Sequence, residues 1–269
     1  MLKKWRRSLA LLLVFLFLMP ATALADYATL DYVSLGDSVA AGYDPYTQTD
    51  QTSYADLINE ALRDAGVPGT YLKAGVTAYT SNDLLRQVTL NSTVRNRLNK
   101  SELVTITIGA NDLLPILIWA NTEPLRLDTY PGKVGKLTLA LLYKTLPADD
   151  FLSTVLAMEI RIMRSKVELT INTIKWLPGK NPKIYLMGYY NPFPYIPEAA
   201  EALSAANSQL KLAAAATGAK FVPTVDSINY MTHLVLLPQD PIHLNPLGHE
   251  VVAELFLNRI AADFQITLN

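Results

Sequence analysis

The sequence contains no cysteine. This absence excludes a cysteine nucleophile and a metal site with thiolate ligands. A chain of 269 residues can bury a full hydrophobic core without disulfides, so the absence is compatible with a secreted protein. Histidine is also scarce, because His233, His243 and His249 are the only three. Any mechanism that needs a histidine base must therefore draw on this short list.

The N-terminal apolar run is too short to cross a membrane. It extends over the eleven residues from Leu9 to Met19, whereas a span needs about 20. A basic start precedes it, and Ala23-Leu24-Ala25, a small-residue cleavage pattern, follows it. We therefore expect residues 1–25 to be a signal peptide, residues 26–269 to form a single domain, and the protein to be secreted. An uncleaved segment retained as a membrane anchor is the alternative, and its shortness argues against it.

The sequence has no excess of positive charge. Removing the four basic residues of the signal segment, with no acidic one, would take the formal net charge from −1 to −5. Such mild acidity argues against nucleic acid or an anionic membrane as the main partner. We expect no stable membrane anchor after cleavage.

Short apolar runs alternate along the chain with helical patterns. The runs are continuous and rich in β-branched and aromatic residues, which is typical of strands covered on both faces. They span Leu30 to Leu35, Tyr71 to Ala74, Leu103 to Ile108, Lys183 to Gly188 and Phe221 to Val225. The helical patterns span Tyr54 to Ala65, Asp83 to Val88, Pro197 to Ala216 and Pro246 to Ala262. This alternation predicts a three-layer α/β/α fold, with a parallel sheet between two helical layers.

Two helix starts can be predicted from capping residues. Ser81 is expected to be the N-cap of the second helix. Asn245 and Pro246 are typical of a cap followed by the first helical position of the last helix.

The segment from Leu113 to Trp176 is long, helical and unusually apolar. Its later part keeps an apolar stripe that includes Leu156 and Ile171, and Glu159 falls outside this stripe. Ordinary core is one interpretation. The other is that part of the segment forms a wall or a lid beside an acyl-binding site.

A serine, an aspartate and a histidine occur in an order that suits a hydrolytic triad. Gly36-Asp37-Ser38 closes the first apolar run, and Asp240 precedes His243 by three residues in a Pro-rich stretch predicted to be a loop with a turn. A serine hydroxyl becomes a good nucleophile only when an oriented base removes its proton. Ser38 as a simple helix cap is the alternative. His249, within the last helix, is expected to be structural, and His233, among apolar residues, is expected to be a core or surface histidine.

Two further motifs lie at predicted strand ends. Gly75 follows the second strand, and Gly109-Ala110-Asn111-Asp112 closes the third. At these four points, in this order, the chain resembles the GDSL or SGNH esterase family, which is named for one Ser, Gly, Asn and His. The residues that match are Ser38, Gly75, Asn111 and His243, with Asp240 as the third triad member.

The chain departs from the family name at Val39, where the name has leucine, an apolar-for-apolar change. Position 40 is alanine, so the Gly-x-Ser-x-Gly elbow of other α/β-hydrolases is absent.

The resemblance implies a flavodoxin-like SGNH hydrolase fold, with a five-stranded parallel sheet and a helical insertion after strand three. It implies Ser38, Asp240 and His243 as catalytic residues, and the N–H groups of Ser38 and Gly75 with the Asn111 amide as the oxyanion hole. No cofactor and no metal are expected.

The predicted activity is that of a GDSL-type serine esterase or lipase that acts on a small-molecule or lipid ester, lysophospholipids included. A polysaccharide O-acetyl esterase of the same family is the first alternative. An inactive surface- or carbohydrate-binding module is the second, and the complete triad argues against it.

Overall fold

The computed structural model describes residues 29–120, 126–193 and 197–268. The predicted signal peptide lies outside these residues. Within the described part of the chain, no helix is both long enough and apolar enough to traverse a bilayer.

Five parallel strands form the central sheet in the order β4-β1-β5-β6-β7. The strands are β1 (Tyr32–Gly36), β4 (Tyr71–Gly75), β5 (Leu103–Thr107), β6 (Lys183–Met187) and β7 (Lys220–Val222). The first strand lies between the second and the third, which is the strand order of flavodoxin-like folds. The predicted α/β class and five-stranded parallel sheet are therefore confirmed. The last strand ends earlier than predicted because Pro223 cannot donate a ladder hydrogen bond.

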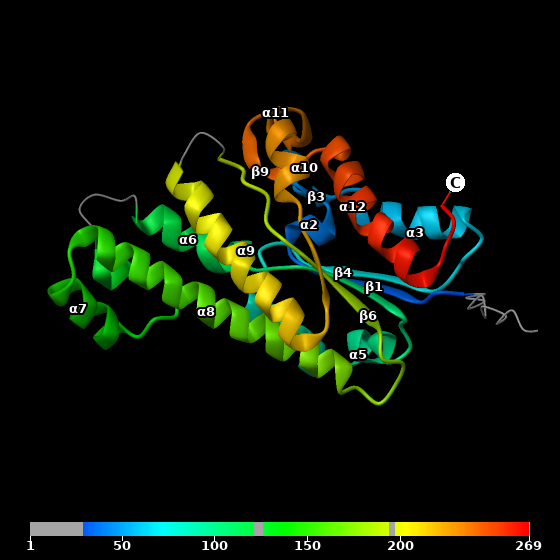
Figure 1. Ribbon diagram of the computed structural model, residues 1–269, viewed down its shortest axis with the longest axis horizontal. Coiled ribbons are helices and arrows are strands. Elements are labelled where there is room, and N and C mark those ends of the chain that lie inside the picture. The colour runs from blue at the N-terminus through cyan, green and yellow to red at the C-terminus, as the bar shows by residue number, and fades with distance from the viewer. Residues whose placement is uncertain (1–28, 121–125, 194–196, 269) are drawn as a thin grey trace, which may run out of the picture.

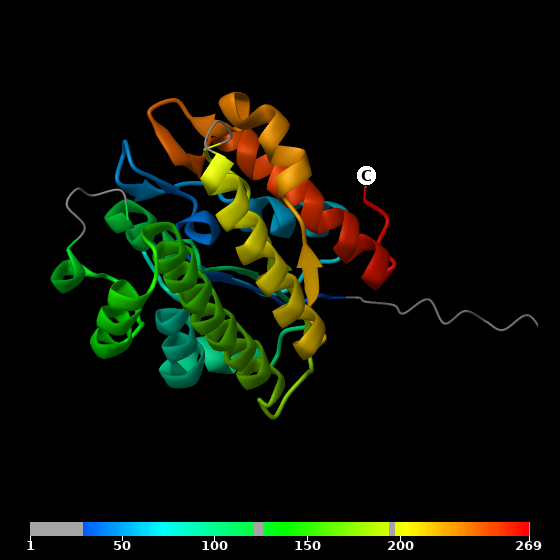
Figure 2. The same cartoon turned by 60° about the vertical axis from the view of Figure 1, so that its left-hand side comes forward.

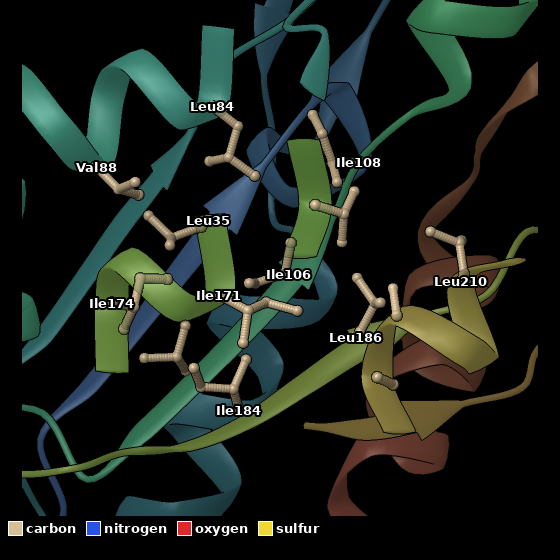
Figure 3. Close-up of a cluster of buried hydrophobic side chains, with 14 of the residues drawn as sticks. Leu35, Leu84, Val88, Ile106, Ile108, Ile171, Ile174, Ile184, Leu186 and Leu210 are labelled. Atoms are coloured by element: carbon tan, nitrogen blue, oxygen red, sulfur yellow. The ribbon is translucent and has the colours of Figure 1, made fainter. Parts of the chain in front are cut away.

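Helices cover both faces of the sheet, as Figure 1 shows. Alternate residues of the strands point to opposite layers. Val33 and Leu35 of β1 join one core cluster, and Tyr32 joins the other. The first cluster, drawn in Figure 3, lies under α4 (Ser81–Leu90), α5 (Ser92–Leu98), α8 (Ala148–Lys175) and α9 (Pro197–Thr217). The second lies under α3 (Tyr54–Asp64), α10 (Val225–Ile228), α11 (Thr232–Val235) and α12 (Pro246–Phe264).

One of the two capping predictions is wrong. The N-cap of α4 is Thr80, whose side chain accepts from the Asp83 N–H, and Ser81 is already the first helical residue. Thr80 was the better candidate because Asp83, three residues later, completes a capping box with it. For α12 the prediction is confirmed, since Asn245 is the N-cap and Pro246 follows it.

The helical segment between the third and fourth strands of the sheet is present as predicted. It consists of α6 (Ala110–Ala120), the 3₁₀ turn η1 (Leu127–Thr129), α7 (Lys136–Thr145) and the long α8. Ile116, Leu139 and Val155, from α6, α7 and α8, share a small core of their own. Figure 2 shows α7 at the side of the molecule, away from the sheet. The segment is therefore partly core and partly a separate layer.

Glu159 of α8 was predicted to lie outside the apolar stripe of that helix, but its side chain is buried. It is only 3% exposed. Its Oε1 atom accepts hydrogen bonds from the Val134 N–H at 2.6 Å, the Tyr130 hydroxyl at 2.6 Å and the Lys133 N–H. A buried carboxylate needs such donors, so Glu159 holds the loop before α7 against α8.

Two short hairpins were not expected. One is β2 (Tyr43–Asp44) with β3 (Thr49–Asp50), and the other is β8 (Leu236–Leu237) with β9 (Asp240–Leu244). The second hairpin replaces the simple loop predicted around His243, and α11 and the 3₁₀ turn η2 (Asn229–Met231) precede it.

Candidate active site

Ser38 lies at the carboxyl end of β1, where a tight turn leads into the one-turn helix α2 (Ser38–Ala41). Gly36 makes this turn possible. Its φ is +140°, and a Cβ there would come within 2.0 Å of the Thr107 carbonyl oxygen on the neighbouring strand. Asp37 is the N-cap, so Ser38 is the first helical residue and not the cap. The serine is 9% exposed.

Ser38, His243 and Asp240 form a continuous hydrogen-bonded line. His243 Nε2 lies 3.1 Å from Ser38 Oγ, and its Nδ1 lies 2.8 Å from Asp240 Oδ2. A carboxylate can only accept, so Nδ1 carries the proton and the Nε2 lone pair faces the serine hydroxyl. Burial opposes ionisation of Asp240, but hydrogen bonds from His243 and the Ile242 N–H outweigh it and lower the pKa.

Asp240 also shapes the backbone that carries the histidine. Its Oδ1 accepts from the Ile242 N–H at 2.8 Å and from the His243 N–H at 3.1 Å. This local turn points the two side chains the same way, as the three-residue spacing predicted. The Tyr190 hydroxyl donates to the Ile242 carbonyl, and the Tyr43 ring packs edge-on against the imidazole at 5.5 Å.

The other two histidines lie away from the serine. His249 is buried in α12, where its Nδ1 accepts from the Tyr54 N–H at 3.2 Å. Burial lowers the pKa of His249 to about 4, so it is neutral at ordinary pH. His233 is exposed on α11.

Gly75 is paired in register with Gly36 on the adjacent strand. Close packing requires glycine at position 75, since a Cβ there would lie 2.5 Å from the Ala41 nitrogen and 2.6 Å from the Ala40 carbonyl carbon. Gly75 thus lets α2 approach β4, which holds Ser38 against the sheet. It is not among the described residues that line the cavity beside Ser38. Its predicted role as an oxyanion donor stays a prediction.

Asn111 stands in the first turn of α6 and lines that cavity. Its Nδ2 donates one hydrogen to the Tyr79 carbonyl at 3.0 Å. An amide nitrogen carries two hydrogens, so one remains for a ligand. Tyr79 belongs to the loop after β4, the strand that ends in Gly75.

Asp112 has a role that the sequence did not reveal. Its Oδ2 accepts from the Ser81 N–H at 2.7 Å, and its Oδ1 accepts from the Ser81 hydroxyl at 2.6 Å. Burial raises the pKa of Asp112 despite these hydrogen bonds. The carboxyl group therefore fastens the first turn of α6 to the start of α4, next to the Asn111 contact. No pattern in the sequence links residues 31 positions apart, so this pairing could not have been predicted.

Asp37 is a second residue whose role the sequence did not show. Its Oδ1 accepts from the Val39 N–H at 3.2 Å and from the Thr107 hydroxyl at 3.1 Å. Burial raises the pKa of Asp37 to about 7. Asp37 joins the ends of β1 and β5 directly beside Ser38.

An apolar cavity of about 160 Å³ opens next to Ser38 and His243. Its walls come from α6, α8, α9 and the segment after β6. They carry Leu114, Leu117, Leu156, Tyr189, Phe193 and Leu203. The predicted apolar wall beside the serine is therefore present, and α9 contributes to it together with the insertion.

Comparisons with known proteins agree with this architecture. The model of the GDSL-like Lipase/Acylhydrolase family matches residues 34–251. No curated protein matches the sequence.

Solved structures with the same fold include several enzymes. A lipase from a goat rumen metagenome has a TM-score of 0.62 at 18% identity, covering 86% of this chain and 97% of that one. An α/β hydrolase enzyme from the metagenome of Lake Arreo, Spain, has a TM-score of 0.58 at 19% identity, covering 85% and 94%. A catalytic mutant of an acetylxylan esterase from Geobacillus stearothermophilus has a TM-score of 0.59 at 17% identity, covering 86% and 94%. At such identities the likeness concerns the fold.

Proposed function

The chain belongs to the GDSL-like lipase/acylhydrolase family, and we propose that it is a secreted serine hydrolase that cleaves carboxylic esters through an acyl-enzyme on Ser38. One observation carries the proposal. The hydrogen-bonded line from Asp240 through His243 to Ser38 ends at a serine that lines an apolar cavity. Nucleophile, base and orienting carboxylate are in reach of one another, and the cavity offers room for an acyl group.

In the proposed acylation, His243 Nε2 takes the hydroxyl proton while Ser38 Oγ attacks the ester carbonyl. Asp240 stays ionised and stabilises the imidazolium that forms, consistent with its lowered pKa. The C–O bond to the leaving alcohol then breaks, and Nε2 returns the proton to that oxygen. A water molecule next attacks the acyl group with the same base, which releases the acid and restores Ser38.

The oxyanion of each tetrahedral intermediate needs fixed donors. We assign the free hydrogen of Asn111 Nδ2 and the N–H groups of Ser38 and Gly75 to this role. Since α2 is one turn long, these individual donors matter more than a helix dipole. The Tyr79 carbonyl supports the assignment because it fixes the orientation of the Asn111 amide.

The apolar cavity supports substrates with an acyl chain longer than acetyl. Such substrates, which include lysophospholipids, correspond to lipase or esterase activity. Each buried methylene would contribute about 0.8 kcal/mol at most. A polysaccharide O-acetyl esterase is the second candidate, and the fold shared with an acetylxylan esterase supports it. Secretion rests on the N-terminal sequence pattern alone.

A hydrolysis profile over p-nitrophenyl esters from acetate to octanoate tests the proposal, with Ser38→Ala as the matched control. We expect kcat/KM to rise from acetyl to at least butyryl or hexanoyl, by up to about fourfold per methylene, and Ser38→Ala to be inactive while folded. A profile that peaks at acetate, with acetate released from acetylated xylan or peptidoglycan, would promote the second candidate.

A further inference from the structure

Helix α7 turns an apolar face to solvent. Leu137 is 86% exposed and Leu141 is 61% exposed. The two lie four residues apart and therefore share one face. Leu139 is buried on the opposite side, in the small core of the insertion. A helix that already buries one apolar face does not need a second apolar face to fold. Exposed apolar patches often mark interaction sites, so we interpret the two outer leucines as a binding surface.

Exposed lysines lie on α7 and just before it. Lys133, Lys136 and Lys144 are exposed, and none forms an ion pair with a carboxylate of the described chain. Tyr143 is also largely exposed, with its ring edge-on to Phe151. Exposed leucines, lysines and an amphipathic aromatic on one helix form the composition that binds the interface of an anionic lipid surface.

The same apolar character continues to the cavity. Leu114 of α6 lines the cavity, and Ile118, one turn later on the same helix face, is 61% exposed. Ile116 of α6 and Leu139 of α7 meet in the small core of the insertion, so the two helices lie at the same end of the molecule (Figures 1 and 2). The apolar lining of the cavity therefore continues into exposed apolar surface of α6, at the end of the molecule that carries α7.

We propose that the outer face of α7, together with Ile118, docks the protein reversibly on an anionic lipid surface and brings the cavity entrance to lipid esters. This inference rests on the proposed function and deepens it, because it makes lipid at an interface the substrate. The remainder of the mature chain is mildly acidic and is repelled by such a surface, so the lysines of α7 also set the orientation of docking. A symmetric contact between two copies is disfavoured, since it would bring lysines against lysines.

Co-sedimentation with vesicles tests docking. Vesicles of phosphatidylcholine and phosphatidylglycerol in equal amounts are compared with vesicles of phosphatidylcholine alone. The variants are Leu137→Ser/Leu141→Ser, Lys136→Gln/Lys144→Gln, and, as a matched control, Leu90→Ser/Leu212→Ser, which changes two exposed leucines of α4 and α9. Hydrolysis of soluble p-nitrophenyl butyrate is measured in parallel, and sedimentation equilibrium without lipid reports the oligomeric state.

We expect the wild type to bind the anionic vesicles and to be released by salt. The leucine pair should weaken binding by about tenfold or more, and the lysine pair should reduce the salt dependence. The control pair should bind like the wild type, and all variants should keep wild-type turnover of the soluble ester. Absence of wild-type binding, equal binding by the leucine variant, or a dimer that this variant dissolves would overturn the docking proposal. If the wild type does not hydrolyse the soluble ester at all, the proposed function is refuted, whatever the vesicle result.

Discussion

At the scale of single residues, the oxyanion assignment depends on contacts between the start of α6 and the segment that leads from β4 into α4. The Asn111 amide is fixed by the Tyr79 carbonyl, and Asp112 joins the same two segments through Ser81. Asn111→Ala should lower kcat by about 10²–10³-fold with little change in KM, because the oxyanion exists only in the transition state. Steady-state kinetics on a butyryl ester measures both constants. A rise in KM alone would mean that Asn111 binds ground-state substrate.

Asp112 is a positioning residue, and its effect should depend on Asn111. Asp112→Ala should lower kcat, mainly by loosening the first turn of α6, which carries the Asn111 amide. In the Asn111→Ala background the same change should cost little further activity, so the two losses should be far from additive. A double-mutant cycle on kcat, with circular dichroism to check folding, makes the comparison. If the two losses of kcat are additive, Asp112 does not act through Asn111 and its role is purely structural.

Asp37 predicts a pH dependence of stability. Its folded pKa of about 7 exceeds the ordinary value of 3.8, so the folded state holds a proton that the unfolded state loses. The stabilisation from this proton is fully present below pH 3.8 and is lost as the pH rises through about 7. Asp37→Asn keeps the Oδ1 acceptor without the charge. The variant should match the wild type in Tm near pH 4 and exceed it by several degrees near pH 8. A difference in Tm that does not change with pH would contradict the account.

At the scale of elements, the sheet could be predicted because its strands are buried on both faces. Largely apolar runs such as Leu103 to Ile108 have few other interpretations when helical patterns separate them. Ser38 and Asn111 could be found for the same reason, since each follows such a run. The hairpin of β8 and β9 could not be predicted, because β8 has only two residues and Pro241 interrupts the pattern of β9. The burial of Glu159 was not predicted, because it depends on three hydrogen-bond donors around Tyr130 to Val134 and not on the helical periodicity of the sequence.

The helical walls of the cavity should set the acyl length. Leu156 of α8 lines the cavity, whereas Leu169, on the same helix, is largely exposed. Leu156→Trp should fill the space and lower kcat/KM for hexanoyl esters by about tenfold or more, with a much smaller effect on acetyl esters. Leu169→Trp is the matched control and should leave the profile unchanged. Equal losses for all chain lengths would show that the acyl group lies elsewhere.

At the scale of the whole molecule, the fold brings the two ends of the sequence together at one edge of the sheet. Ser38 follows the first strand, and His243 is 205 residues away in the chain. Ligands in open α/β sheets bind at the carboxyl ends of the strands, which is where these residues meet. His249 belongs to the second core instead, as its contact with the Tyr54 N–H shows. The proposed ester hydrolysis depends on this assembly, because it is what activates the serine.

The most direct test is the reaction of the protein with a fluorophosphonate probe, followed by mass spectrometry of the labelled peptide. An activated serine reacts rapidly, whereas an ordinary one does not. We expect one adduct, on Ser38, in the wild type and in His249→Ala as far as that variant folds, and none in Ser38→Ala. Labelling of His243→Ala should be slower by several orders of magnitude, with Asp240→Asn between it and the wild type. A wild-type protein that stays unlabelled, or a His243→Ala variant labelled at the wild-type rate, would contradict the account.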